Sequence, residues 1–245
     1  MSDIIPANKT SNQIGLVKES SLHAALKKWY SQPDDVIEKN VMGYYIDIVR
    51  GNQLIEIQTS NFSAISKKIQ VLLEAYPVHL VYPLIVKKWI KKISADGTQT
   101  IRKSPKKGRL EDIFWEVVKI PKCISYPNFS LEVVSVLVEE TWVIQPVKTR
   151  RSSWRRKGWA IQDRQLLNVI DRVNFSDVAD YSTFLEEISD DQIFSSSELA
   201  KSLSVQISLA RKMIYTFRNI GLIHAAGKNR NTFLYKKVNT EKPVE

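Results

Sequence analysis

The chain has 245 residues, of which 43% are hydrophobic, so it can form one large or two modest globular domains, and this composition excludes a disordered protein. No apolar run approaches the roughly 20 residues that cross a bilayer, which predicts a cytoplasmic protein without membrane segments. The net charge of +10 predicts a polyanionic partner, and nucleic acid is favoured over a membrane surface because the bases do not lie on an amphipathic helix.

The first half of the sequence predicts an α/β arrangement. Residues 1–18 show no periodicity and are expected to form a flexible arm. A helix follows from Ser20 or Ser21, because apolar residues recur at helical spacing up to Tyr30. A short strand is expected at 36–41, and residues 44–58 predict a β-hairpin with Gly51 and Asn52 as its two-residue loop.

The following residues continue this alternation of helices and strands. A helix over 61–76 ends at Pro77, and an apolar strand over 78–86 has the composition of a strand buried on both faces. A hairpin over 87–103, a short helix over 110–120 and a long strand over 131–145 complete the predicted domain, which spans residues 19–146.

A basic segment at 147–159 is the predicted linker to a second domain, which spans residues 160–245 and is predicted to be mainly helical. Residues 160–173 read as a helix, and Ser195 precedes Glu198 at the spacing of a capping box. Two closely joined helices and two strands around residues 227–231 then resemble the winged-helix fold, which binds DNA in many proteins.

The hairpin carries the candidate site. Counting outward from the Gly51–Asn52 loop places Asp47 directly opposite Glu56, with Gln58 on the same face and isoleucines on the other. Like charges at that spacing are destabilising unless a cation lies between them. Mg²⁺ or Mn²⁺ held by the two carboxylates would support attack on a phosphodiester, so Asp47 and Glu56 are predicted metal ligands and Gln58 a predicted catalytic residue.

These residues resemble the PD-(D/E)xK, or restriction-endonuclease-like, nucleases, which carry an acid on one strand and Glu-x-Lys on its hairpin partner. The resemblance covers roughly residues 20–85 and implies a mixed sheet flanked by helices and Mg²⁺-dependent DNA cleavage. Gln58 stands where the family has lysine, and Ile46 stands where it has proline. Lys67 or Lys68 is a candidate for the missing cation, and Glu19 for an additional metal ligand.

Two basic clusters and the C-terminal module supply the candidate nucleic-acid contacts. The residues predicted to contact nucleic acid are Arg102, Lys103, Lys106, Lys107, Arg109, Arg150, Arg151, Arg155, Arg156, Lys157, Arg211, Lys212, Arg218, Lys228 and Arg230.

The sequence therefore predicts a metal-dependent DNA endonuclease, with RNA as the alternative substrate and a homodimer as a possible assembly. The competing hypothesis is a non-catalytic DNA-binding protein or regulator that keeps a nuclease-like scaffold. Metal binding would discriminate between these two functions.

Overall fold

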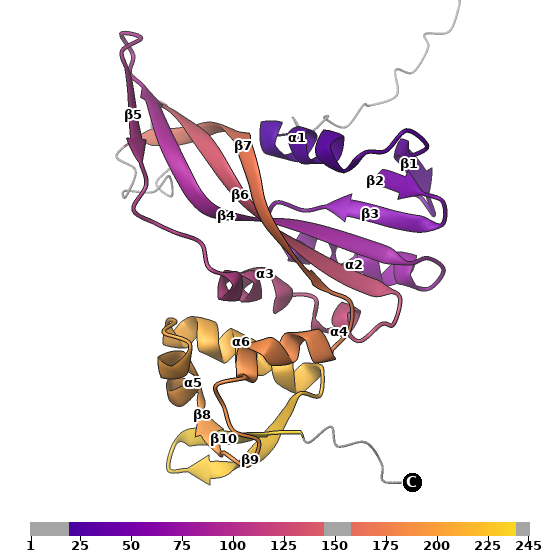
Figure 1. Cartoon of the computed structure of the whole chain (residues 1–245), viewed down its shortest axis with the longest axis vertical. Helices are drawn as coiled ribbons and strands as arrows, with labels where there is room; N and C mark the ends of the chain where they lie inside the picture. Colours follow the sequence, from indigo (N-terminus) through magenta and orange to yellow (C-terminus); the bar gives the residue numbers. More distant parts are fainter. Residues whose placement is uncertain (1–19, 145–157, 239–245) are drawn as a thin grey trace, which may run out of the picture.

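A computed structural model of the protein describes residues 20–144 and 158–238, and its first six elements follow the predicted order (Figure 1). These elements are α1 (Ser21–Tyr30), β1 (Val36–Val41), β2 (Tyr44–Arg50), β3 (Gln53–Ile57), α2 (Phe62–Leu73) and β4 (Val78–Ile93). Ser20 caps α1, since its side chain accepts a hydrogen bond from the His23 amide. The predicted helix, strand, hairpin, helix and apolar strand are confirmed.

The main sheet is completed by β5 (Gln99–Lys103), β6 (Phe129–Ile144) and β7 (Trp159–Phe175). The strand order is β1-β2-β3-β4-β6-β7, and β5 pairs with the outer part of β4. The β3–β4 and β4–β6 pairs are parallel, whereas the other pairs are antiparallel. The predicted α/β class with a mixed sheet is therefore confirmed.

The two faces of the sheet are covered differently, because β4 and β6 present apolar side chains on both sides. One face packs against Leu22 and Leu26 of α1. The other face packs against α2 and the short helices that connect β5 to β6, namely η1 (Leu110–Ile113), α3 (Phe114–Val117) and α4 (Pro121–Ile124). Gly108 leads into η1 so close to the Ile85 carbonyl that an added Cβ would clash with it.

The prediction of a helix over residues 160–173 is wrong, because these residues form β7. Three residues of β7 are skipped in its pairing with β6, which makes each of them the extra residue of a β-bulge: Gln162, Leu167 and Ile170. Each bulge interrupts the alternation of side chains between the two faces of the strand. Leu166 and Val169 therefore lie on one face although they are three residues apart, which is a spacing typical of a helix. The sheet therefore continues past the predicted boundary at residue 160.

The C-terminal elements form a small unit with its own sheet. They are η3 (Ala179–Leu185), β8 (Phe194–Ser195), α5 (Ser196–Ser202), α6 (Ile207–Asn219), β9 (Ile223–Asn229) and β10 (Thr232–Lys237). The three strands pair in the order β8-β10-β9. The predicted capping box is confirmed, with the Ser195 and Glu198 side chains each bonded to the backbone of the other.

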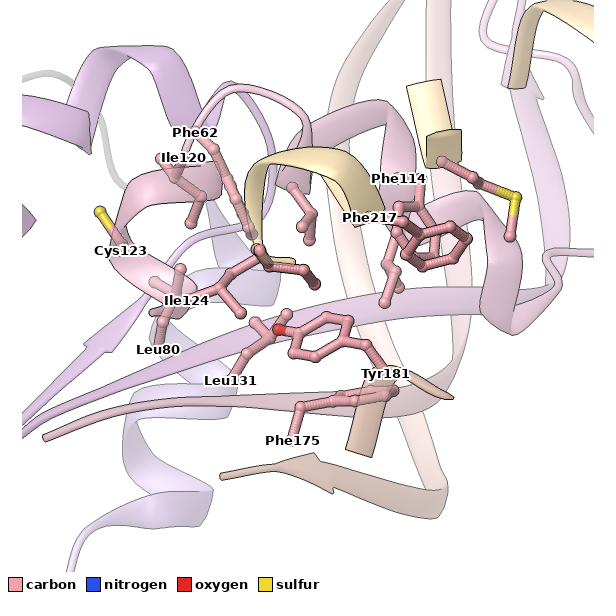
Figure 2. Close-up of a cluster of buried hydrophobic side chains, with 14 of the residues drawn as sticks. Phe62, Leu80, Phe114, Ile120, Cys123, Ile124, Leu131, Phe175, Tyr181 and Phe217 are labelled. Atoms are coloured by element: carbon pink, nitrogen blue, oxygen red, sulfur yellow. The ribbon is translucent and has the colours of Figure 1, made fainter. Parts of the chain in front are cut away.

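The C-terminal unit shares one apolar core with the main sheet (Figure 2). The ring centroids of Phe114 on α3 and Phe217 on α6 lie 5.2 Å apart, and Phe175 at the end of β7 packs on Tyr181 of η3. Outside the core, Arg109 donates hydrogen bonds to the carbonyls of Leu203 and Ser204 in the turn before α6. These contacts fix the orientation of α6 relative to the sheet.

Candidate metal centre

The candidate site begins where the ladder between β2 and β3 ends. The register pairs Arg50 with Gln53, Val49 with Leu54 and Ile48 with Ile55, as the two-residue loop predicts. Beyond Ile48 the strands part, and the Ile57 amide donates instead to the Asp47 carboxylate at 2.8 Å. The ladder thus stops one residue short of Asp47 and Glu56, and the predicted direct pairing of the two acids is not part of it. Asp47 reaches β3 through its side chain, and its charge is close enough to act on Glu56.

A local distortion of β1 and β2 accompanies this opening. Ile48 packs beneath α1, whereas Ile46 packs in the core on the opposite face. The prediction that the isoleucines of the hairpin share one face is therefore wrong for Ile46, and it holds for Ile48, Ile55 and Ile57. The change of face occurs at Asp47, opposite Glu38, whose backbone has a positive φ of 53°. This distortion lets the Asp47 carboxylate reach toward β3.

The Asp47 carboxylate is held by α1 as well as by β3. His23 Nε2 lies 3.2 Å from the same oxygen, Oδ2, that accepts the Ile57 amide. Both side chains are largely buried, since His23 exposes 21% and Asp47 15% of its side-chain surface. The sequence did not indicate the His23 contact, because 24 residues separate the two partners.

Glu56 points toward α2 and is 7% exposed. Its Oε1 accepts a hydrogen bond from Lys68 Nζ at 2.5 Å, and the same ammonium donates to the Tyr45 carbonyl at 2.6 Å. The second oxygen, Oε2, is buried and has no hydrogen-bond partner. A buried carboxylate oxygen without a partner is energetically costly unless a proton or a cation satisfies it.

The two carboxylates have opposite pKa shifts. Burial raises the pKa of Glu56, and the nearby Asp47 charge adds to this effect, which together outweigh the lowering by Lys68. Burial also opposes ionisation of Asp47, but its hydrogen bonds to His23 and the Ile57 amide, with the charges of His23 and Lys68, lower its pKa overall. The site therefore contains one readily ionised acid beside one that resists ionisation.

The other residues predicted for this site are placed differently. The Gln58 side chain donates to the Ser60 carbonyl in the loop after β3, and among the described residues it forms no hydrogen bond with Asp47 or Glu56. Lys67 is exposed on α2, whereas Lys68 reaches Glu56, so Lys68 is the candidate cation. Glu19 lies outside the described residues. Within the described ranges, no group of three acidic, histidine or cysteine side chains is arranged to hold a metal.

A second polar network lies on the α1 face of the sheet, centred on Glu132. His79 Nε2 lies 2.9 Å and the Tyr30 hydroxyl 2.6 Å from Glu132 Oε2, and the other ring nitrogen of His79 contacts Ser130 Oγ at 2.7 Å. Arg172 approaches the second oxygen of Glu132 at 3.6 Å. The partners satisfy one another and join the end of α1 to β4, β6 and β7, which is a structural role.

The basic residues around β5 fall into two groups. Arg102 and Lys103 on β5, and Lys106 and Lys107 in the loop after it, are exposed. Arg109 is instead occupied by Glu111 and by the turn before α6, so its contacts indicate a structural role rather than the predicted nucleic-acid contact. The remaining predicted bases of this kind lie outside the described residues: Arg150, Arg151, Arg155, Arg156 and Lys157.

The basic residues of the C-terminal unit also have different surroundings, since some of them lie against aromatic rings and some are exposed. Lys212, one of the predicted nucleic-acid contacts, lies 5.4 Å from the ring centroid of Trp115, between α6 and α3. Arg211 and Arg218 are exposed on the other side of α6. Lys228 lies over Phe233 at 5.4 Å, and Arg230 occupies the turn between β9 and β10.

Fold and site together define an α/β protein with a buried pair of acids at the opening of a hairpin. A family model described as a domain of unknown function (DUF8091) matches residues 20–176, which is more than half of the chain. The chain belongs to this family. The match ends one residue after β7, in agreement with the place of β7 in the main sheet.

A relative from Treponema pallidum (strain Nichols), described as an uncharacterized protein, is 28% identical over 228 residues. The aligned region covers 91% of this chain and 87% of the relative, so the two proteins are similar across both the sheet and the C-terminal unit. No solved structure is significantly similar to the chain. Among the described residues, no helix has the length and apolar character needed to cross a membrane.

Proposed function

We propose that the protein is a Mg²⁺- or Mn²⁺-dependent nuclease that hydrolyses phosphodiester bonds in DNA, with Asp47 and Glu56 as metal ligands. The observation that carries the proposal is the buried, unpartnered Oε2 of Glu56 beside an ionised Asp47. Such a buried oxygen is energetically costly unless a proton or a ligand satisfies it, and we propose that the ligand is a metal ion.

The residues fit a hard divalent cation. Mg²⁺ is usually held by one or two carboxylates, with water and phosphate oxygens completing its shell, so a site with two acids is sufficient. The raised pKa of Glu56 is also expected of a ligand whose charge is compensated only when a cation binds. When bound, the ion would polarise the phosphate and lower the pKa of a bound water.

The chain's own residues would position the acids and the substrate. His23 and the Ile57 amide fix Asp47, while Lys68 fixes one oxygen of Glu56 and leaves the other free to bind. We assign to Lys68 the place of the lysine that the PD-(D/E)xK pattern has at position 58. Its ammonium would stabilise negative charge that develops on the phosphate, because it contacts Glu56 and its charge also acts on Asp47.

The arrangement of elements supports the finer fold assignments. A hairpin with the two acids, followed by α2 and the parallel strand β4, has the order of the restriction-endonuclease-like core. In the C-terminal unit, η3, β8, α5, α6 and the β9–β10 hairpin follow the order of helix, strand, two helices and wing that suits a winged helix. We therefore propose a nuclease-like domain joined to a winged-helix module.

DNA is the proposed partner because of the net charge of +10 and the exposed bases on β5, its following loop and α6. A homodimer is the proposed assembly for cleavage of both strands, since the described part of each chain offers one candidate metal centre.

A cleavage assay tests the proposal. Purified protein is incubated with circular and linear DNA, single- and double-stranded, in Mg²⁺, Mn²⁺ or chelator. We expect cleavage only with metal, a loss of at least 100-fold in Asp47→Ala and Glu56→Ala, and a marked loss in Lys68→Ala. Lys67→Ala is the matched control, because Lys67 is exposed on the same helix. Cleavage that survives in Glu56→Ala would overturn the assignment.

The second candidate function is non-catalytic DNA binding on the same scaffold. It is favoured by the internal partners of both acids, since His23 and Lys68 can neutralise them without a metal. This candidate predicts DNA binding with no cleavage and no response of the folded protein to Mn²⁺. The nuclease proposal predicts that Mn²⁺ raises the melting temperature of the wild type but not of Glu56→Ala.

A further inference from the structure

A groove of about 570 Å³ lies between α6, the start of α5 and the strand β10. Its volume falls within the range of roughly 300–1,000 Å³ typical of ligand sites. The lining residues that bear on its chemistry are Arg211, Tyr215 and Arg218 from α6, and Phe233 from β10. None of the described lining residues is acidic.

The groove exposes two aromatic rings from different elements. Tyr215 is 53% and Phe233 58% exposed, although rings of this size bury well in protein cores. The Lys228 ammonium lies over one face of the Phe233 ring and adds a further cation beside it. Arg211 and Arg218 lie one turn on either side of Tyr215 along α6 and are also exposed. Aromatic rings alternating with arginines, without acids, match a strand of nucleic acid, whose bases stack and whose phosphates need cations.

The surroundings of α6 argue against the insertion of this helix into the major groove of a duplex. Arg109 covers the turn before α6 by binding the carbonyls of Leu203 and Ser204. On the side away from the groove, Lys212 lies against Trp115 of α3. The N-terminal end and one side of α6 are thus occupied by the main domain, and the exposed stripe that is left faces the groove.

We propose that this groove binds a single-stranded segment of nucleic acid, with unstacked bases against Tyr215 and Phe233 and with phosphates on Arg211 and Arg218. The inference rests on the proposed function for its choice of DNA as the ligand, and it deepens that function by naming an unpaired strand as the form that the C-terminal unit holds. Bases of a duplex are stacked on each other and leave exposed rings without a partner.

Fluorescence anisotropy with the full chain in chelator tests the inference without cleavage. The probes are a labelled oligothymidine and a labelled blunt hairpin duplex with the same number of phosphates. We expect the oligothymidine to bind at least tenfold more tightly than the duplex. Tyr215→Ala and Phe233→Ala should each weaken oligothymidine binding about tenfold or more, whereas Tyr215→Phe and Phe233→Tyr should retain it.

Charge variants complete the test. Arg211→Ala should weaken binding and reduce the salt dependence by about one phosphate contact, whereas Lys201→Ala, an exposed base of α5 outside the groove lining, should not. Equal affinity for duplex and oligothymidine, or Tyr215→Ala binding like the wild type, would overturn the inference.

The binding test can be separated from the proposed cleavage. Oligothymidine binding that depends on Tyr215, in a protein that never cleaves, would support the groove and refute the nuclease. Metal-dependent cleavage by a protein whose oligothymidine binding is unchanged in Tyr215→Ala and Phe233→Ala would support the nuclease and refute the groove.

Discussion

At the scale of single residues, the surroundings of the two acids Asp47 and Glu56 stabilise their charged forms to different extents. Asp47 is stabilised in its charged form by His23, Lys68 and a backbone amide, whereas Glu56 has one oxygen bonded to Lys68 and one without a partner. A site that only needed neutral side chains would not retain two buried carboxylates. In the function that we propose, a divalent cation is the partner of this second oxygen.

Replacing Lys68 should destabilise the protein in a pH-dependent way. Lys68 lowers a Glu56 pKa that burial has raised, so Lys68→Met should raise it further. Below the ordinary pKa of a glutamate, Glu56 is protonated in both the folded and the unfolded state. The raised pKa then has no effect on the free energy of unfolding. Above that pKa, Glu56 loses its proton more readily in the unfolded state than in the folded state. The loss of unfolding free energy in Lys68→Met relative to the wild type therefore grows with pH, to about 3 kcal/mol.

Urea unfolding of the wild type and Lys68→Met between pH 4 and pH 8 measures this effect, with Lys67→Met as the control. Loss of the hydrogen bond to the Tyr45 carbonyl contributes a part that does not vary with pH. A deficit that is equal at both ends of the pH range would contradict the assigned role of Glu56.

Much of the site could be predicted from sequence, and the part that could not has a clear physical reason. The Gly51–Asn52 loop predicts the register of the three residue pairs nearest the turn, and this ladder stops just before Asp47 and Glu56. The contacts of His23 and Lys68 are made across the packing of α1 and α2 on the sheet, and no local pattern encodes them. Lys68 was one of two adjacent candidates, because sequence does not show which of them faces the sheet.

At the scale of elements, the bulges of β7 explain why its sequence predicts a helix although it forms a strand. Leu166, Val169, Ile170 and Val173 have the spacing of an amphipathic helix. In the strand, Leu166 and Val169 pack toward α1, but Ile170 is the extra residue of a bulge and is 53% exposed. The elements from α1 to β6 were predictable because their apolar spacing, capping residues and turn residues match the helices and strands that form.

Alanine substitutions along β7 distinguish the two interpretations. A helix would bury Ile170, whereas the bulged strand half-buries Leu166 against the α1 face of the sheet and exposes Leu167. We expect Leu166→Ala to lower the free energy of unfolding by about 1–3 kcal/mol, and Leu167→Ala and Ile170→Ala to change it by about 0.5 kcal/mol or less. Chemical denaturation measures the three variants, and a large loss in Ile170→Ala would count against the bulge.

At the scale of the whole molecule, the sheet and the C-terminal unit share a core. Phe114 and Phe217 are fully buried against each other, and the Phe175–Tyr181 contact joins β7 to η3. Sequence suggested two separate domains, because a basic segment divides the chain and composition gives no sign of long-range packing. The shared core holds the groove and the candidate metal centre in a fixed relation.

This packing predicts cooperative unfolding. Differential scanning calorimetry of the full chain should show a single transition, and Phe217→Ala should shift that whole transition to lower temperature, with a loss of about 3–5 kcal/mol. Two resolved transitions, of which Phe217→Ala moves only one, would show that the two units unfold independently.

The central claim, a divalent cation held by Asp47 and Glu56, is tested most directly by isothermal titration of the full chain with Mn²⁺ near pH 8. We predict saturable binding to the wild type, its loss in Asp47→Ala and Glu56→Ala, and its retention in Glu187→Ala, which removes an exposed acid outside this site. Absence of Mn²⁺ binding in the wild type, or binding that survives in both site variants, would contradict the account.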